Sequence, residues 1–128
     1  MDRSKLFPLP FEERMIALRR QALGDGLLDA LVLWRGELSR PAEQQSQPYL
    51  KSFSARNEAT LTALEREAPA LESSAYSIGH VAIGCALCYL DFRFADRQWR
   101  LDHPQLARWH ATFAARPSVG ATEPIDDA

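Results

Sequence analysis

Apolar residues recur every three or four positions through most of this chain, which is the spacing of one face of a helix. The pattern predicts four helices, at residues 10–39, 48–68, 77–92 and 103–115. No stretch alternates apolar and polar residues as a half-buried strand would. The chain is therefore expected to be all-α, a helical bundle, with a short extra turn around Asp96.

The first predicted helix carries an apolar stripe interrupted by two glycines. Its expected inner side chains are Ile16, Leu23, Leu27, Leu31, Trp34 and Leu38, widened by Leu28 and Val32. Gly24 and Gly26 fall within this stretch, and each glycine costs a helix about 1 kcal/mol relative to alanine. We therefore expect a bend there, or the close approach of another backbone.

Two residues of the second predicted helix break its pattern. The inner face is marked by Leu50, Phe53, Leu61 and Leu64. Asn57 interrupts this stripe, and we expect it to be a hydrogen-bonded polar group of the core, with a water-filled seam as the alternative. Pro69 cannot supply the N–H that a further helical turn needs, so it is expected to end the helix.

The third predicted helix has a clear start and no charge along its length. Ser77 is a good N-cap residue, because its hydroxyl accepts a hydrogen bond from an N–H of the first turn. Tyr76 and Val81 occupy the two positions of a hydrophobic staple around it. No charged residue follows until after Leu90, and only His80 is clearly polar, so this helix is expected to be buried on every side.

Two segments in the second half of the chain resemble a known family. The stretches YSIGHVAIGCALCYLDFRF and HPQLARWHATFAARPSV are similar to the C-terminal helical domain of cytosolic, bacterial-type glutathione transferases. The likeness extends from Leu6 to Pro124. It implies a lead at residues 1–9, the helical domain at 10–116 and a tail at 117–128. The N-terminal thioredoxin-like domain of that family, which holds most of the glutathione site, is expected to be absent.

The resemblance departs at His80, where the family has an aspartate in a Ser/Thr-x-x-Asp capping box. A carboxylate at this position bonds back to the N-cap N–H and favours the positive end of the helix dipole. We therefore expect a weaker helix start here, weaker still in mild acid, and a higher melting temperature for His80→Asp. The alternative is that His80 points into a pocket or packs against a neighbour.

The resemblance also implies where glutathione and an electrophile would lie. In many family members an aspartate of the first helix, followed by glycine, reaches across the dimer to the ammonium group of the partner's glutathione, and Asp25 matches that position. A solvated acidic edge formed with Asp29 is the alternative. The first helix would supply a wall of the electrophile pocket, and helix geometry points to Arg14, Leu18 and Gln21.

No catalytic set is expected within the chain. Ser77, His80 and Asp91 suggest a triad, but capping explains Ser77, and Asp91 lies three turns further along the same helix, too far to orient His80. Glutathione is the co-substrate that the resemblance implies. Its thiol needs donors to become the reactive thiolate, so we expect this chain alone neither to bind glutathione nor to conjugate it.

No metal site is expected either. Cys85 and Cys88 form a C-x-x-C spacing inside a helix, without a second ligand pair for zinc and without the helix-start position of a redox pair. They are expected to be small core residues. His103 and His110 are seven residues apart, whereas metal pairs on helices usually stand four apart. His103 is expected to precede or cap the last helix.

Composition narrows the class of protein further. The 128 residues suit one domain, and 46% apolar with 25% charged residues is typical of a globular chain. The net charge of −2, with scattered basic residues, argues against nucleic acid and anionic membranes as partners. No apolar run reaches the ~20 residues that span a bilayer, and residues 1–10 lack a signal-peptide core. A cytoplasmic location is expected.

Three functions remain open from the sequence. The first is the helical half of a glutathione transferase, which supplies the electrophile-side wall and the dimer interface but is inactive alone. The second is a stand-alone domain for protein–protein contact, which forms a homodimer or larger assembly through its first two helices or binds a separate thioredoxin-like domain. The third is a binder of small apolar ligands in a groove lined by Trp34, Tyr89 and Trp99, although aromatic residues at helical spacing are more often core.

Overall fold

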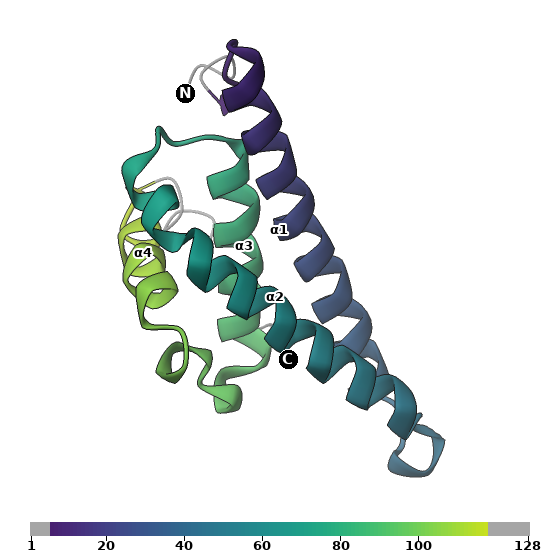
Figure 1. Cartoon of the computed structure of the whole chain (residues 1–128). Coiled ribbons are helices and arrows are strands. Elements are labelled where there is room, and N and C mark those ends of the chain that lie inside the picture. Colours follow the sequence, from purple (N-terminus) through teal and green to yellow (C-terminus); the bar gives the residue numbers. More distant parts are fainter. Residues whose placement is uncertain (1–5, 118–128) are drawn as a thin grey trace.

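The computed structural model describes residues 6–117, in which the chain folds into helices joined by short connections. The α-helices are α1 (Phe11–Leu38), α2 (Gln47–Ser73), α3 (Ile78–Arg93) and α4 (Pro104–Ala114) (Figure 1). Short 3-10 helices occupy the connections: η2 (Ala42–Gln44), η3 (Ala95–Arg97) and η4 (Trp99–Leu101). Residues 6–117 contain no strand, so the all-α prediction is confirmed, as is the extra turn around Asp96.

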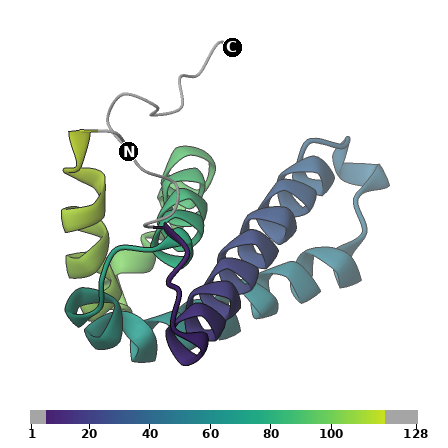
Figure 2. The ribbon, with the colours of Figure 1, turned by 90° about the horizontal axis from the view of Figure 1, so that it is seen from above.

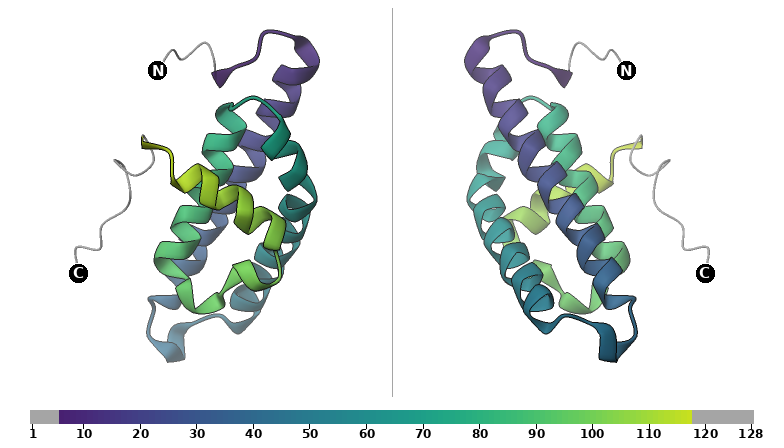
Figure 3. Two further views of the ribbon diagram at one scale, coloured as in Figure 1. Left: turned by 90° about the vertical axis from the view of Figure 1, so that its left-hand side faces the viewer. Right: turned by 90° about the vertical axis from the view of Figure 1, so that its right-hand side faces the viewer.

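The four α-helices enclose one apolar core. Seen from above, α3 lies between α4 and α1 (Figure 2), and the side views show α3 running alongside α1 (Figure 3). The connection between α1 and α2 projects beyond the other helices (Figure 1). The most deeply buried apolar side chains are Leu31 and Trp34 of α1, Leu61, Leu64 and Leu71 of α2, Ile83, Leu87 and Leu90 of α3, and Leu106 of α4.

The buried face of α1 is rotated from the predicted stripe. Its buried residues are Ala17, Arg20, Gly24, Leu27, Leu31 and Trp34. Ile16, Val32 and Leu38 are 42%, 49% and 38% exposed, so the prediction that they face inward is wrong. Small residues replace larger apolar ones on this face because α3 passes close to the α1 backbone.

Gly24 is the point where the two backbones meet. A Cβ atom there would lie 2.6 Å from the backbone nitrogen of Ile83 and would also overlap the backbone of Ala82. The predicted close approach is therefore confirmed at Gly24. Within the described residues nothing lies within 4 Å of a Cβ placed on Gly26, so this glycine takes no part in the close approach.

α2 runs through Pro69 to Ser73, so the prediction that Pro69 ends it is wrong. A proline inside a helix costs about 3 kcal/mol or more, but Ala68 and Leu71 on either side of it are buried in the core and favour the continued helix. Asn57 is buried, with 4% of its surface exposed, yet its Oδ1 has no hydrogen-bond partner among residues 6–117. The prediction of a satisfied core amide is wrong for that atom.

α3 begins at the predicted position but is buried on one side only. The buried side consists of Gly79, His80, Ile83, Gly84, Ala86, Leu87 and Leu90. The opposite side, which we call the outer stripe, consists of Ile78, Val81, Ala82, Cys85, Cys88, Tyr89 and Phe92. Cys85 is exposed and the rest of the outer stripe is partly buried.

The outer stripe corrects two predictions. α3 is not buried on every side, and the two cysteines are not both core residues, since Cys85 is exposed and Cys88 is only partly buried. The absence of charged residues indicates that this side of α3 is apolar, but it does not identify the part of a protein that covers it. Within residues 6–117 no single helix is long and apolar enough to cross a bilayer, and α3 reaches that length only together with the 3-10 turns, after a bend of 93°.

A carboxylate from α2 caps the start of α4. Glu65 accepts hydrogen bonds from the backbone N–H groups of Gln105 at 3.1 Å and Leu106 at 2.8 Å. His103 precedes the helix as predicted, but its side chain makes no capping bond. Residues 1–5 of the predicted lead and 118–128 of the predicted tail lie outside the described residues.

Candidate functional site

The first turn of α3 is held by hydrogen bonds that converge on His80. The N–H of Gly79 donates to the Ser77 hydroxyl at 3.2 Å, and the N–H of Ser77 donates to Nδ1 of His80 at 3.2 Å. The capping box is therefore closed by an imidazole. Nε2 of His80 lies 2.9 Å from the carbonyl oxygen of Leu71, and because a carbonyl only accepts, Nε2 carries the proton.

The ring of His80 closes the box and also packs in the interior, so the alternative interpretation of this residue is confirmed, while the expected weaker helix start stays a prediction. Its centroid lies 5.6 Å from that of Tyr76 and 6.0 Å from that of Trp109. Burial lowers the pKa of His80, and the nearby charges of Arg20 and Arg116 lower it further, although the bond to the helix carbonyl opposes them. The folded protein therefore favours the neutral imidazole, which is the form that both hydrogen bonds require.

A cavity of about 380 Å³ lies beside His80 between the end of α2 and α4. It is lined by Leu71, Glu72, Ser74, Tyr76, His80, Trp109, Thr112, Phe113 and Arg116. The Arg116 guanidinium lies 3.6 Å from the centroid of the Tyr76 ring. Tyr76 thus connects the start of α3 to Arg116, near the end of the described residues. Its staple contact with Val81 stays a prediction.

A buried arginine joins α1 to the end of α2. Arg20 donates to Glu67 at 3.1 Å and to the Ser74 hydroxyl at 3.2 Å, and Arg19 donates to the same carboxylate at 2.6 Å. Burial raises the pKa of Glu67, but the two arginines outweigh it, so the net pKa shift is downward. Arg20 also lines a cavity of about 340 Å³ beside Ala17 and Ser77.

The four residues predicted to face substrate share one side of α1. Arg14, Leu18, Gln21 and Asp25 are spaced by four, three and four residues, which places them along one line of the helix. Arg14 and Asp25 are exposed, and Leu18 and Gln21 are partly buried. They line none of the cavities described here. The structure therefore aligns them on one side of α1, outside these three cavities.

Asp25 lies close enough to α3 to affect Cys85 of the outer stripe. Partial burial raises the pKa of the Cys85 thiol, and the Asp25 carboxylate raises it further. The side of α1 that carries Asp25 is thus continuous with the outer stripe. Together they form one surface, partly charged on α1 and uncharged on α3.

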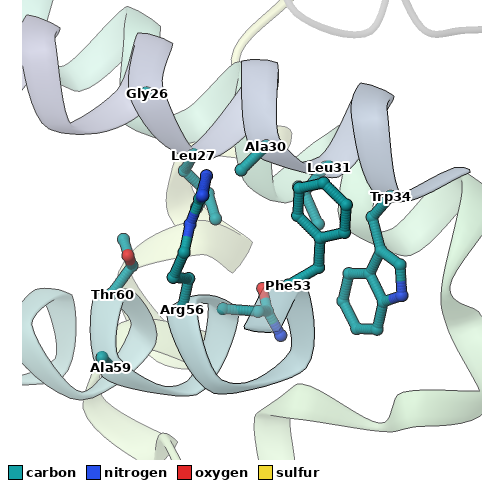
Figure 4. A pocket seen from close by; sticks show the side chains of 10 residues that line it. Gly26, Leu27, Ala30, Leu31, Trp34, Phe53, Arg56, Ala59 and Thr60 are labelled. Atoms are coloured by element: carbon teal, nitrogen blue, oxygen red, sulfur yellow. The ribbon is translucent and has the colours of Figure 1, made fainter. Parts of the chain in front are cut away.

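A smaller cavity of about 190 Å³ opens between α1 and α2 (Figure 4). Leu27, Leu31 and Trp34 line it from α1, and Phe53 and Asn57 line it from α2. The guanidinium of a further lining residue, Arg56, lies over the Phe53 ring at 5.4 Å. Asn57 is a lining residue, but its Oδ1 is buried and has no hydrogen-bond partner among residues 6–117, so the water-filled seam stays a prediction.

The aromatic residues suggested as a ligand groove are part of the core instead. Trp34 and Trp99 are buried, and Trp34 stacks on Phe94 with centroids 4.6 Å apart. The Trp99 indole donates to Asp91 at 2.9 Å. Tyr89 packs against the same core from the outer stripe. The groove prediction is therefore wrong.

A polar cluster that sequence analysis does not predict lies between α3 and α4. Asp91 binds Arg100 through both oxygens, at 2.6 and 2.7 Å, and Arg100 also approaches Nδ1 of His110 at 3.2 Å. The other ring nitrogen of His110 lies 3.4 Å from Sγ of Cys88. Burial raises the pKa of Asp91, but its bonds to Arg100 and Trp99 lower it overall. Asp91 is thus engaged away from Ser77, in agreement with the rejection of a triad.

Comparison with known proteins gives a consistent family. No protein-family model matches the chain. It is 33% identical over 106 residues to the uncharacterized GST-like protein YibF of Escherichia coli (strain K12), a match that covers 81% of this chain and 52% of that protein.

Solved structures extend the comparison to the fold. A glutathione transferase family member from Pseudomonas fluorescens Pf-5, with bound S-(propanoic acid)-glutathione, matches with a TM-score of 0.88 and 40% identity over 94% of this chain and 63% of that one. A glutathione S-transferase from Methylobacillus flagellatus KT, with glutathione bound, matches with a TM-score of 0.86 and 28% identity over 94% of this chain and 61% of that one. The chain spans only about half to five-eighths of the length of these relatives.

Proposed function

Because this chain is a helical domain of the glutathione transferase family, we propose that it is the scaffold half of a two-part enzyme that joins glutathione to an electrophile. Its relatives extend well beyond the matched region. The remaining part of such an enzyme would hold glutathione and activate its thiol, since thiolate is the nucleophile. We expect this chain alone not to catalyse conjugation.

The outer stripe of α3 is the observation that supports this proposal. It is uncharged over four turns, although its centre at Cys85 is exposed. Covering apolar surface with a partner stabilises the complex by about 25 cal/mol for each Å² removed from water. A glutathione-binding module seated there would cover the stripe, together with the neighbouring side of α1.

The same arrangement gives the aligned residues of α1 a role. Arg14, Leu18 and Gln21 would form the wall of the electrophile pocket that faces the second module. Asp25, one turn further on, would bind the ammonium group of glutathione held by a partner subunit, as the family resemblance implies. An exposed carboxylate is suited to that ammonium, because a charge-assisted hydrogen bond is stronger than a neutral one.

The proposal is tested by supplying the second module. We would measure glutathione binding by calorimetry and conjugation of an aromatic halide, first with this chain and then with this chain fused to the N-terminal half of the Pseudomonas fluorescens relative. We expect no turnover from the chain alone and turnover from the fusion. Turnover by the chain alone, or an inactive but folded fusion, would contradict the proposal.

A pair of lysine variants tests the outer stripe within the same fusion. Cys85→Lys places a charge at the centre of the stripe, whereas Thr62→Lys places one on the exposed side of α2. We expect Cys85→Lys to reduce turnover at least tenfold and Thr62→Lys to leave it unchanged, with both isolated domains melting at similar temperatures. Equal activity of the two fusions would contradict the role proposed for the outer stripe.

Self-association through α1 and α2 is a second proposed property, supported by large exposed apolar side chains. Leu33 of α1 and Tyr49 of α2 are 62% and 63% exposed, and Met15 is 48% exposed. We propose that these residues lie in a homodimer interface. Light scattering during gel filtration should report a dimer for the chain and a monomer for Leu33→Lys. A monomer at high micromolar concentration would contradict this second proposal and leave the first intact.

A further inference from the structure

Cys88 lies at the edge of the outer stripe nearest α4, against a buried histidine and an arginine. Its Sγ is 3.4 Å from Nε2 of His110, whose side chain comes from α4 and is only 2% exposed. On the other side of the imidazole, Arg100 lies 3.2 Å from Nδ1. Three elements, α3, η4 and α4, therefore meet at this thiol.

The partners of His110 determine where its proton lies. An arginine guanidinium has only donors, so Arg100 donates to Nδ1 and Nδ1 is the acceptor. The proton of the neutral ring is then on Nε2, which faces Cys88. The Gly84 carbonyl, one helical turn before Cys88, also accepts from this ring. Burial lowers the pKa of His110, so the neutral form predominates.

The charges around the cluster favour a negative sulfur. The Nε2–H of His110 is shared between Sγ of Cys88 and the Gly84 carbonyl, and an N–H donor stabilises a thiolate more than a thiol. Asp91 is the one acidic neighbour in the cluster, and its carboxylate is bound by Arg100 and by the Trp99 indole. The bond to Asp91 raises the pKa of Arg100, and a charged Cys88 would raise it further.

We propose that Cys88 is a reactive thiol that exchanges with small disulfides, with His110 and Arg100 as positioning residues that stabilise its thiolate. The thiolate attacks one sulfur of the disulfide, whose S–S bond breaks as the new S–S bond to Cys88 forms. The other half leaves as a thiolate, and the proton that Cys88 gave up goes to solvent. No further oxidant or reductant is needed.

Cys85 provides an internal comparison. It is more exposed than Cys88, but burial and the Asp25 carboxylate raise the pKa of its thiol. Accessibility alone therefore predicts that Cys85 reacts faster, whereas the polar cluster predicts that Cys88 does. The chain has only these two cysteines, so one serine substitution isolates each thiol.

The test uses the full chain and a nitrobenzoate disulfide that releases a coloured thiolate. Cys85→Ser leaves Cys88, and Cys88→Ser leaves Cys85; rates are followed from pH 5 to 9, folded and in urea. We expect folded Cys88 to react about threefold faster than Cys85 at pH 7, because a pKa lower by about one unit gives tenfold more thiolate but a weaker nucleophile. We also expect the rate of Cys88 to reach half its maximum at a lower pH in the folded protein than in urea.

A second variant tests whether the polar cluster, rather than general packing, sets the reactivity of Cys88. Arg100 is half-exposed, and Arg100→Gln in the Cys85→Ser background removes both the positive charge beside His110 and the ion pair with Asp91. We expect its pH midpoint to move upward toward the value in urea, with circular dichroism unchanged. The proposal would be overturned if the pH midpoint of folded Cys88 equals its midpoint in urea, or if Cys88 reacts more slowly than Cys85 at pH 7. An unchanged midpoint in Arg100→Gln would overturn it as well.

Discussion

At the scale of single residues, His80 makes two hydrogen bonds that a carboxylate cannot make together. Nδ1 accepts from the Ser77 N–H, while Nε2–H donates to the Leu71 carbonyl at the end of α2. An aspartate would keep the first bond and gain from the helix dipole. It would lose the second bond and the contacts of the ring with Tyr76 and Trp109. The structure thus reverses the expected effect of His80→Asp.

We predict that His80→Asp lowers the free energy of unfolding by about 1–2 kcal/mol, because it leaves the Leu71 carbonyl without its donor and opens space in the interior. Urea denaturation at pH 7.5 measures the change. His80→Asn is the matched control, since its side chain is similar in size to aspartate but uncharged. The difference between the two variants reports the gain from the carboxylate at the helix start. A more stable His80→Asp protein would support the original sequence expectation.

Gly24 and Gly26 form a natural pair for a second prediction. A methyl group on Gly24 would overlap the α3 backbone, whereas one on Gly26 meets no described atom within 4 Å. We predict that Gly24→Ala lowers the melting temperature by several degrees. Gly26→Ala should stabilise the protein by about 0.5–1 kcal/mol through helix propensity. Calorimetry of both variants checks this, and similar effects of the two substitutions would contradict the assigned contact between α1 and α3.

At the scale of elements, α4 depends on α2 for its cap. The Glu65 carboxylate accepts two N–H groups that the first turn of α4 would otherwise leave without partners. We predict that Glu65→Ala lowers the free energy of unfolding by about 1–2 kcal/mol, within the range for loss of a helix cap. Glu65→Gln keeps one acceptor oxygen and should lose less. Hydrogen exchange at Gln105 and Leu106 should accelerate in Glu65→Ala, and unchanged exchange there would argue against the cap.

The sequence predicted the existence of these elements better than their faces. Periodicity identified all four helices, and the N-cap at Ser77 is confirmed. The predicted inner face of α1 is wrong because it follows the large apolar residues, whereas contact with α3 requires small residues at Ala17 and Gly24. Pro69 does not end α2 as predicted, because local propensity does not include the burial of Leu71 beyond it.

The candidate sites show the same difference: positions along one helix can be predicted from the sequence, whereas contacts between residues far apart in the chain cannot. Helical spacing was enough to place Arg14, Leu18 and Gln21 on one line. The contact of Cys88 with His110 joins residues 22 positions apart, and it depends on how α4 packs against α3. No spacing rule predicts that contact, so the cysteine was interpreted from its own helix as a core residue.

At the scale of the whole molecule, the core holds two histidines whose pKa values are lowered in the same direction. His80 joins α3 to α2, and His110 joins α4 to the cluster on α3. Burial is the leading cause for both. Glu67 and Asp91 also have lowered pKa values, but their carboxyl groups take up protons only in much stronger acid. Mild acid therefore acts on the two histidines alone among these four groups.

We predict that the chain loses stability as the pH falls from 7.5 to 5.5. The histidines have a pKa near 6.5 in the unfolded chain, which is above the pKa of the buried rings. The unfolded state therefore binds more protons in this range, so the free energy of unfolding decreases as the pH decreases. Each histidine contributes at most about 1.4 kcal/mol per pH unit. Urea denaturation across this range measures the slope, and His80→Asn should reduce it by removing one of the two groups. A flat profile, or a slope that His80→Asn leaves unchanged, would mean that the interior accepts the charged imidazole and that the hydrogen bonds assigned to neutral His80 do not hold α3 in place.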